Sequence, residues 1–368
     1  MATLEHIMVQ NFRNIVFADL EFSPGVNCIC GNNGQGKTNL LDAVHFLSMT
    51  KSALGIPDRY CIRQGCRSFA LGGVYRLPDG IGTKLSLSVD EKGKTVQRDG
   101  KAYRRISSHI GLLPIVAVSP SDGALVSEGG EQRRSFVNSV LCQMDVAYMA
   151  DLQKYNRLLD QRNHLLKEAS PDAMLLDTLD CSLSPLAERI SGARAEFTSR
   201  LEVLVAEFYK ELSGNGESVG IGYRSDMGDG VSLEEQLSRN RQRDMILRFT
   251  SAGVQRDDFI FTMNGVPIRR CGSQGQQKSF IVAVKLAQYE MMRRAYGYAP
   301  QLLLDDLFDK LDRRRIAALM ALVGRGDYGQ IFITDTNRDR VDEIVRGVTA
   351  DTAYFNAANG EFQTGEVE

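Results

Sequence analysis

The chain has 368 residues, of which 43% are hydrophobic, and its formal net charge is -2 at pH 7. A chain of this length can bury a large core and is expected to divide into two or three units. It contains no run of eighteen apolar residues and its first residues do not resemble a signal peptide, so we expect a cytoplasmic protein without a spanning helix. The small negative charge leaves only local basic patches for nucleic-acid contacts. Seven cysteines without a CxxC pair and four histidines predict neither a disulfide framework nor a zinc site.

The segment 26–49 has the pattern of a strand, a glycine-bearing loop and a helix. Its apolar run VNCIC predicts a buried strand, the loop reads GNNGQGKT, and an apolar-faced helix is predicted at 40–48. In such a P-loop the backbone N–H groups and the helix N-terminus bind phosphate oxygens. Lys37 would reach the β- and γ-phosphates of ATP, and the Thr38 hydroxyl would bind Mg²⁺. The nucleotide-binding residues predicted from the loop are Gly31, Asn32, Asn33, Gly34, Gln35, Gly36, Lys37 and Thr38.

Two further motifs lie in the last third of the chain. GSQGQQK at 272–278 precedes a helix and creates a second helix N-terminus able to bind an anion, although a serine N-cap would give the same pattern. The apolar run 302–304 predicts a central parallel strand that delivers Asp305 and Asp306 to its carboxyl end, where α/β sheets bind ligands. There Asp305 would hold the Mg²⁺ shell through water, and Asp306 would position or deprotonate the attacking water. Solvated aspartates at a strand end are the alternative.

The three motifs together resemble the ABC-type ATPase heads of the SMC-like group, and their sequences are most similar to those of the RecF family of bacterial DNA-repair proteins. Matching stretches span nearly the whole chain: NFRN at 11–14, SPSD at 119–122, RRSF at 133–136, RDD at 256–258 and SQGQQK at 273–278. The resemblance adds Arg13, Asn14 and Asn39 to the predicted nucleotide contacts. It implies an α/β fold, namely an ABC-type P-loop ATPase head with a mixed sheet flanked by helices, an antiparallel β lobe and an inserted helical arm or lid.

In such heads two subunits enclose ATP between the P-loop of one and the signature loop of the other. The resemblance therefore implies an ATP-dependent homodimer in which Ser273, Gln274, Gly275 and Gln276 meet the nucleotide in trans. Asp312 would lie in the D-loop, which crosses the dimer interface. The resemblance also implies recognition of gapped DNA or single-/double-strand junctions, and help in loading the RecA recombinase together with the RecO and RecR mediators.

Some positions depart from the broader ABC pattern. Most ABC ATPases carry Asp-Glu where this chain has Asp305-Asp306, and the second side chain is one methylene shorter, so we expect slow, DNA-dependent ATP hydrolysis. The usual switch histidine is missing after the strand predicted at 330–333, and Thr334, Asp335 or Thr336 lies in its place. The segment 119–122 lacks the glutamine that transporters carry there.

The order of elements predicts an ATPase head that is split around an insertion. We expect residues 1–145 to hold the P-loop and an antiparallel lobe, 146–250 a helical arm, and 251–368 the signature loop, the Walker B strand and the D-loop. In the arm, apolar residues recur every eleven positions over 186–212, which predicts a helix of about thirty residues, roughly 45 Å long. A helix is predicted at 233–247, and the Asn264-Gly265 pair predicts a hairpin at 259–269.

Arginine clusters are the candidate DNA contacts. The principal candidates are Arg104, Arg105, Arg133 and Arg134, with further clusters at 239–243 and 313–315. A cluster of this kind more often forms a solvent-exposed surface than a phosphate-binding site. Because no base-reading motif is present, any recognition would be of the DNA backbone and of DNA structure.

Three alternatives come from other functional classes. The nucleotide-binding subunit of a transporter would need membrane partners. The missing histidine, the long insertion and the RecF-like motif sequences argue against this interpretation. A P-loop kinase would leave the loop at 273–277 without a role. A scaffold that binds ATP without turnover is the third alternative, and it stays open.

Overall fold

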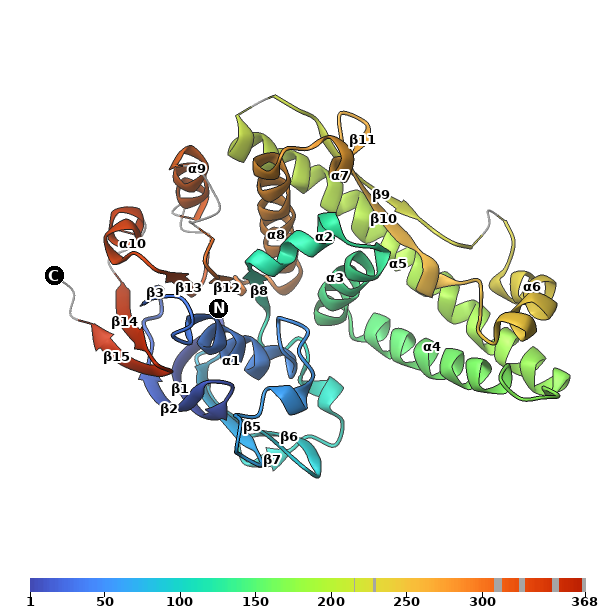
Figure 1. Ribbon diagram of the computed structural model, residues 1–368, viewed down its shortest axis with the longest axis horizontal. Coiled ribbons are helices and arrows are strands. Elements are labelled where there is room, and N and C mark those ends of the chain that lie inside the picture. Colours follow the sequence, from blue (N-terminus) through green and yellow to red (C-terminus); the bar gives the residue numbers. More distant parts are fainter. Residues whose placement is uncertain (215, 228–229, 308–312, 324–327, 346–350, 366–368) are drawn as a thin grey trace. The chain divides into compact units, whose positions relative to one another are not determined.

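The computed structural model describes the chain except for residues 215, 228–229, 308–312, 324–327, 346–350 and 366–368 (Figure 1). The chain forms two compact units: the first comprises Met1–Gly123, Phe208–Asn215 and Gln274–Glu368, and the second Ala124–Glu207 and Gly216–Ser273. The division predicted from the sequence, with an insertion at 146–250, stays a prediction about domains. Among the described residues, no helix has both the length and the apolarity needed to cross a membrane.

The first unit is built around a six-stranded mixed sheet in the order β15-β14-β3-β13-β12-β8. Its strands are β3 (Val26–Cys30), β8 (Ile115–Val118), β12 (Gln301–Leu304), β13 (Ile331–Asp335), β14 (Thr352–Ala358) and β15 (Glu361–Gly365). All neighbours pair in parallel except β14 and β15. The strands predicted at 26–30 and 302–304 are therefore confirmed, and their carboxyl ends lie at the same edge of the sheet.

An antiparallel sheet in the order β2-β1-β4-β5-β6-β7 forms the predicted lobe of the first unit. Its strands are β1 (Thr3–Phe12), β2 (Ile15–Glu21), β4 (Phe69–Arg76), β5 (Gly82–Asp90), β6 (Gly93–Arg98) and β7 (Lys101–Ala102), followed by the 3-10 helix η2 (Ile106–His109). Helix α1 (Lys37–Met49) packs against strands of both sheets. Phe46 of this helix meets Phe12 and Phe69 edge to face, with ring centroids 5.9 and 5.4 Å away. This aromatic cluster joins the P-loop helix to the lobe.

The 3-10 helix η1 (Asp58–Tyr60) lies after α1, and further α-helices of the first unit begin at or after the signature motif. They are α8 (Gln274–Tyr296), α9 (Arg313–Val323) and α10 (Arg338–Val345), and the short η3 (Pro120–Gly123) follows β8. Helix α8 is buried along most of its length from Ser279 to Met292. A helix that is apolar on several faces belongs in the interior of a domain, which agrees with this burial.

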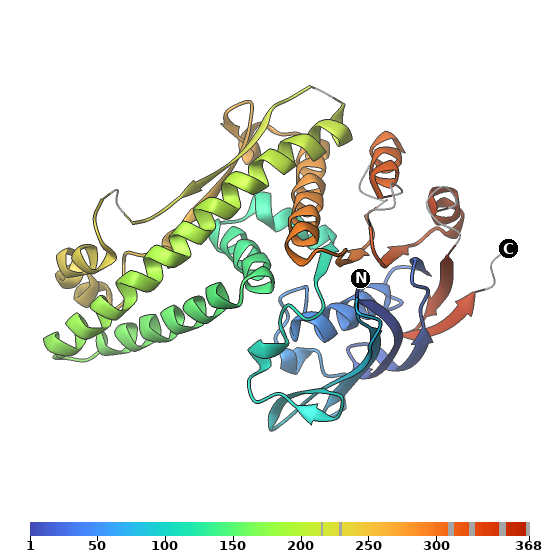
Figure 2. The same cartoon turned by 180° about the vertical axis from the view of Figure 1, so that it is seen from behind.

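The second unit is mainly helical and carries a small antiparallel sheet in the order β11-β10-β9 (Figures 1 and 2). Its elements are α2 (Ala124–Ser127), α3 (Gly130–Met144), α4 (Val146–Leu165), most of α5 (Ala173–Ser213), β9 (Val219–Arg224), α6 (Leu233–Leu247), η4 (Val254–Arg256), β10 (Asp258–Met263), β11 (Val266–Pro267) and α7 (Ile268–Cys271). Helices α4 and α5 run antiparallel, and the buried Arg162 guanidinium joins them by donating to Asp180 at 2.6 Å. The same guanidinium donates to Asp244 of α6 at 2.7 Å, so three helices share one buried cation.

Two predicted elements differ from those observed. Helix α5 has 41 residues because it continues through Pro185, whereas about thirty were predicted. Proline removes one backbone hydrogen bond from the helix. The free energy gained by burying Leu183 and Leu186 on either side of it offsets this loss. The predicted hairpin does turn at Asn264-Gly265, with φ of 50° and 76°, but its second strand ends at Pro267 and the chain then turns into helix α7.

Candidate nucleotide site

The P-loop follows β3 and ends in α1, as its sequence predicts. Gly31 lies so close to β14 that a Cβ atom there would be 2.4 Å from the Ala357 carbonyl oxygen. Gly36 immediately precedes the helix with φ of 107°, in the region that favours glycine. These two positions explain why the loop needs glycine. Asn32 and Asn33 are exposed.

The Lys37 side chain is folded into the loop that carries it. Its ammonium donates to the carbonyl oxygens of Gly31, at 2.7 Å, and Asn32, at 3.2 Å, and lies 3.9 Å from Asp306 Oδ1. Only 3% of Lys37 is exposed. A buried ammonium held by carbonyl oxygens at a helix N-terminus is suited to meet the oxygens of a phosphate chain.

The Asp305 carboxylate is the meeting point of three elements. Its Oδ1 accepts hydrogen bonds from Thr38 of α1, at 2.9 Å, and from Thr334 of β13, at 2.7 Å. Burial raises the pKa of this carboxyl above its ordinary value and the charge of Asp306 acts in the same direction, while the two threonine hydroxyls oppose the rise. A hydroxyl and a carboxylate 2.9 Å apart are oxygen donors of the kind Mg²⁺ prefers, so Thr38 and Asp305 fit the predicted metal role.

Asp306 has a backbone conformation that is unusual for a residue other than glycine. Its φ is 42°, and its backbone N–H donates to the Thr334 hydroxyl at 2.9 Å. The side chain is 26% exposed and directs Oδ1 toward Lys37. The structure thus brings the two predicted catalytic carboxylates and the P-loop lysine into one cluster.

The turn between β1 and β2 braces the P-loop from one side. Arg13 Nη1 donates to Asn39 at 3.0 Å, and its Nη2 lies 2.8 Å from the buried Asp42 carboxylate. Asn39 donates to the Asn14 side chain at 2.7 Å, and Asn14 in turn donates to the Gly34 carbonyl at 3.4 Å. Arg13, Asn14 and Asn39 therefore lie beside the loop, and their contact with a nucleotide stays a prediction.

A second brace comes from the chain's final hairpin, and sequence reasoning missed it. The Gly360 N–H donates to the Gln35 carbonyl at 2.9 Å, and the Asn359 N–H donates to the Gln35 side chain. A Cβ atom on Gly360 would lie 2.4 Å from the Asn14 carbonyl oxygen, so both braces also touch each other. The sequence signal was available in Asn359-Gly360, a two-residue hairpin turn, but its partner lies more than three hundred residues away.

The signature segment forms the turn between α7 and α8. Gly272 follows the last residue of α7, and α8 begins at Gln274, so the predicted helix N-terminus is present. Ser279 of α8 donates to the Gly275 carbonyl at 3.0 Å, and a Cβ atom on Gly275 would lie 2.8 Å from the Arg315 guanidinium. Contact of Ser273, Gln274, Gly275 and Gln276 with a nucleotide stays a prediction. The predicted D-loop residue Asp312 lies outside the described residues.

The three candidates for the position of the switch histidine differ in their contacts. Thr334 contacts both Asp305 and Asp306, as described above. The Asp335 carboxylate, 1% exposed, is instead held by Arg340 Nη2 at 2.6 and 2.7 Å and accepts from the Asn337 N–H at 2.7 Å. Of the three, Thr334 is therefore the one whose hydroxyl is hydrogen-bonded to the carboxylate pair.

The candidate DNA-contacting arginines fall into two groups. Arg104 and Arg105 are exposed in the first unit. Arg133, in the second unit, pairs with Asp258 at 2.9 and 3.2 Å and also donates to the carbonyl of Leu125 at 3.1 Å. These contacts within the unit give Arg133 a structural role, and DNA contact by any of these arginines stays a prediction.

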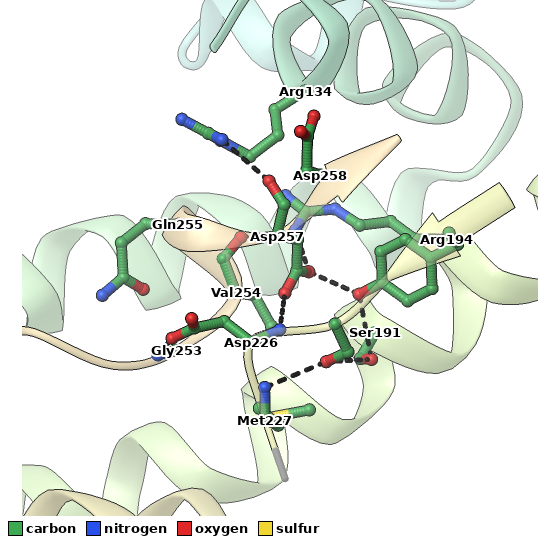
Figure 3. Close-up of polar contacts among 12 residues, drawn as sticks. Arg134, Ser191, Arg194, Asp226, Met227, Gly253, Val254, Gln255, Asp257 and Asp258 are labelled. Atoms are coloured by element: carbon green, nitrogen blue, oxygen red, sulfur yellow. Dashed lines mark hydrogen bonds and ion pairs between the residues drawn. The ribbon is translucent and has the colours of Figure 1, made fainter. Parts of the chain in front are cut away.

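Arg134 belongs to a buried polar network around Asp257 (Figure 3). Arg134 donates to the Asp257 carbonyl at 2.8 Å, while the Asp257 carboxylate accepts from Arg194 at 2.6 Å and from the Tyr223 hydroxyl. Burial, with the nearby Asp257 charge, raises the pKa of Tyr223 to about 12. The hydroxyl oxygen of Tyr223 also lies 3.0 Å from the Ser191 hydroxyl, from which it can accept a hydrogen bond because its own proton goes to Asp257. The RDD motif at 256–258 thus supplies the polar centre of the second unit.

A P-loop lysine, a carboxylate pair at the end of a parallel strand of the same sheet and an antiparallel lobe together define an ATPase head of the ABC type. A family model described as an AAA domain matches residues 6–170. The DNA replication and repair protein RecF of Porphyromonas gingivalis W83 is 44% identical over 359 residues, which cover 97% of this chain and 99% of that protein. The protein of the same name from Parabacteroides distasonis is 39% identical over 361 residues, with 98% of each chain covered. The chain therefore belongs to the RecF family.

Solved structures agree with this assignment. A structure described as the recombination mediator protein RecF-ATP in the RecFOR pathway has a TM-score of 0.89 and 29% sequence identity, covering 99% of this chain and 98% of that chain. The Smc head domain of Pyrococcus furiosus, at 14% identity and a TM-score of 0.59, shares the fold. The resemblance to RecF and to SMC-like heads predicted from the sequence is confirmed.

Proposed function

We propose that this protein is an ATP-dependent DNA-binding protein of recombinational repair and replication restart, in which ATP closes a homodimer on gapped or junction DNA. The observation that carries the proposal is the cluster of Lys37, Thr38, Asp305 and Asp306 in a chain that is RecF-like over 97% of its length. The relatives carry the name DNA replication and repair protein, and a solved relative is described as a recombination mediator with ATP.

The P-loop residues have separate roles in nucleotide binding. Backbone N–H groups from Gly31 to Thr38 would bind the phosphate oxygens, and Lys37 would exchange its two carbonyl partners for the β- and γ-phosphates. Thr38 and Asp305 would hold Mg²⁺, which when bound offsets the negative charge that develops on the transferred phosphoryl group. ATP-Mg²⁺ is thus the proposed cofactor.

Asp306 is proposed to position or deprotonate the water that attacks the γ-phosphate. Its carboxylate lies at the end of β12 beside the P-loop, and it is partly exposed, so water can reach it. An aspartate reaches about one methylene less far than the glutamate of most ABC ATPases, so we expect weak, slow hydrolysis that DNA stimulates. Slow hydrolysis would let the closed dimer persist before it resets.

The dimer step uses a second copy of the chain. Ser273 and Gly275 at the start of α8 would contact the γ-phosphate held by the partner's P-loop, with Gln274 and Gln276 beside them and Asp312 in the crossing loop. ATP would then favour the closed dimer because it binds that state more tightly than the open one. Hydrolysis removes the γ-phosphate contact and would release the DNA.

DNA and the mediators are the proposed macromolecular partners. With a net charge of -2, DNA contact must come from local patches, of which the exposed Arg104 and Arg105 are the strongest candidates. Such contacts would be to phosphates, so affinity should fall steeply with salt. RecO, RecR and RecA loading are proposed from family membership, as is a cytoplasmic location.

Self-association measured by light scattering tests the dimer model. We expect the wild-type protein to be a monomer without nucleotide and with ADP, and a dimer with ATP-Mg²⁺. Ser273→Arg should bind ATP with wild-type affinity and stay monomeric, because the large cation blocks the trans contact. Lys37→Ala should fail to bind nucleotide at all. Normal ATP-dependent dimers from Ser273→Arg would refute the trans signature contact, and dimers without hydrolysis would favour the scaffold alternative.

A further inference from the structure

Thr334 is placed by the central sheet between the P-loop and the carboxylate pair. It is the fourth residue of β13, which pairs in parallel with β3 on one side and β12 on the other. In that register Thr334 is opposite Ile29 of β3 and one position beyond the pair formed by Ile333 and Leu304. Its side chain is fully buried, at 0% exposure. A hydroxyl at this depth needs hydrogen-bond partners, since an unpaired buried polar group is destabilising.

The Thr334 hydroxyl makes two hydrogen bonds of opposite sense. It donates its proton to Asp305 Oδ1 at 2.7 Å, and it accepts the Asp306 backbone N–H at 2.9 Å. Thr38 donates to the same Asp305 oxygen at 2.9 Å. A hydroxyl has one proton and two lone pairs, so this arrangement uses both of its functions. One side chain therefore fixes the side chain of the first aspartate and the backbone of the second.

The bond to the Asp306 backbone matters because Asp306 has a φ of 42°. Left-handed backbone is uncommon for residues other than glycine and costs free energy unless the surroundings hold it. In this conformation Asp306 Oδ1 lies 3.9 Å from the Lys37 ammonium. If φ relaxed to the ordinary negative region, the carboxylate would swing away from the lysine. In this conformation the Asp306 N–H donates to the Thr334 hydroxyl.

We propose that Thr334 is a positioning residue that sets the orientation of Asp305 for the metal and of Asp306 for the attacking water. This inference rests on the proposed ATPase function. On this inference ATP turnover depends on Thr334 and nucleotide binding does not. Thr334 contacts the carboxylate pair, whereas the P-loop groups that bind phosphate are bonded to other partners. Loss of the hydroxyl should therefore lower kcat and reduce the Mg²⁺ response, that is, the tightening of nucleotide binding by Mg²⁺. Binding of the nucleotide without Mg²⁺ should stay largely intact.

The test compares Thr334→Val, which removes the hydroxyl at nearly constant volume, with Thr334→Ser, which keeps it. Thr83→Val is the matched control, because Thr83 is also a buried strand threonine of the first unit that donates to an aspartate, Asp99, at 3.0 Å. For each protein we would measure steady-state ATP hydrolysis, the Kd of a fluorescent ATP analogue with and without Mg²⁺, and the thermal unfolding midpoint.

We expect Thr334→Val to lower kcat about tenfold or more and to remove the tightening of nucleotide binding by Mg²⁺, with the Mg²⁺-free Kd within about twofold of wild type. Thr334→Ser should restore both, and Thr83→Val should lower the unfolding midpoint without changing kcat. The inference is overturned if Thr334→Val keeps wild-type turnover and Mg²⁺ response, or if Thr334→Ser is equally impaired. If the wild type itself does not hydrolyse ATP, the proposed ATPase fails, while loss of the Mg²⁺ response in Thr334→Val alone still supports the positioning role.

Discussion

The Lys285 ammonium of helix α8 lies 2.7 Å from the carboxylate of Asp122, in the segment that follows β8. Both side chains are largely buried, at 10% and 16% exposure. Asp122 also accepts the Ser119 N–H at 2.7 Å, and the last residue of β8, Val118, accepts the Asp305 N–H at 2.8 Å. One short path of contacts thus joins the signature helix to the Walker B strand within the first unit.

The first prediction concerns this ion pair. Replacing either Asp122 or Lys285 with alanine should destabilise the protein, because each change leaves the other charge partly buried without its partner. In a double-mutant cycle on urea unfolding we expect a coupling free energy of about 1 to 3 kcal/mol. The exposed pair of Glu196 and Arg200 is the control and should couple by less than about 0.5 kcal/mol. Equal coupling in the two cycles would show that the pair adds nothing beyond a surface contact.

The second prediction concerns the hairpin that braces the P-loop. Gly360→Ala should weaken ATP binding, because the added Cβ meets the Asn14 carbonyl at 2.4 Å and pushes the hairpin off Gln35. Gly80→Ala is a close control, since Gly80 has nearly the same φ, 83° against 81°, but nothing within 4 Å of its Cβ position. Both variants should lose about 1 kcal/mol of stability from backbone strain.

Titration with a fluorescent ATP analogue distinguishes the two glycine variants. The Kd should rise for Gly360→Ala and stay at the wild-type value for Gly80→Ala. An unchanged Kd in Gly360→Ala would mean that the hairpin does not support the loop.

The third prediction concerns pH. His109 is fully buried and donates from Nε2 to the Leu47 carbonyl at 2.7 Å, and burial lowers its pKa below the ordinary value of 6.5. Below pH 6.5 the unfolded chain binds a proton that the folded chain does not, so stability is present above that pH and is lost as pH falls. His109→Gln keeps a comparable N–H donor but cannot be protonated.

Urea unfolding at pH 7.5 and at pH 5.5 measures this effect. The wild type should lose more unfolding free energy over this interval than His109→Gln does. The same loss in both proteins would assign the pH dependence to other groups. His45, whose pKa burial lowers to about 4, acts in the same direction and is retained in both proteins.

The short-range patterns of the chain predicted the core of the site. The run at 26–30, the P-loop, and the aspartates after 302–304 specify local structure, and a parallel sheet places such strand ends at one edge. The cluster of Lys37 with Asp305 and Asp306 follows from that rule alone. The contacts of Thr334 did not, because Thr334, Asp335 and Thr336 are all polar residues at a strand end, and strand register decides which of them faces β12.

Features that depend on partners distant in sequence escaped prediction. The Gln35 brace pairs residues more than three hundred positions apart. Arg133 looked like a surface cation, yet it pairs with Asp258, 125 positions away. The helix predicted over about thirty residues is 41 residues long, because the leucines buried on both sides of Pro185 keep α5 continuous through it. In each case tertiary packing outweighs the local signal.

The most direct test of the account is fluorescence anisotropy of a labelled gapped duplex, measured with ATP-Mg²⁺, with ADP-Mg²⁺ and without nucleotide, for the wild type and Ser273→Arg. We predict binding that appears only with ATP, weakens steeply with salt and is absent in Ser273→Arg. Binding that is absent throughout, or that ignores both nucleotide and mutation, would contradict an ATP-gated DNA clamp.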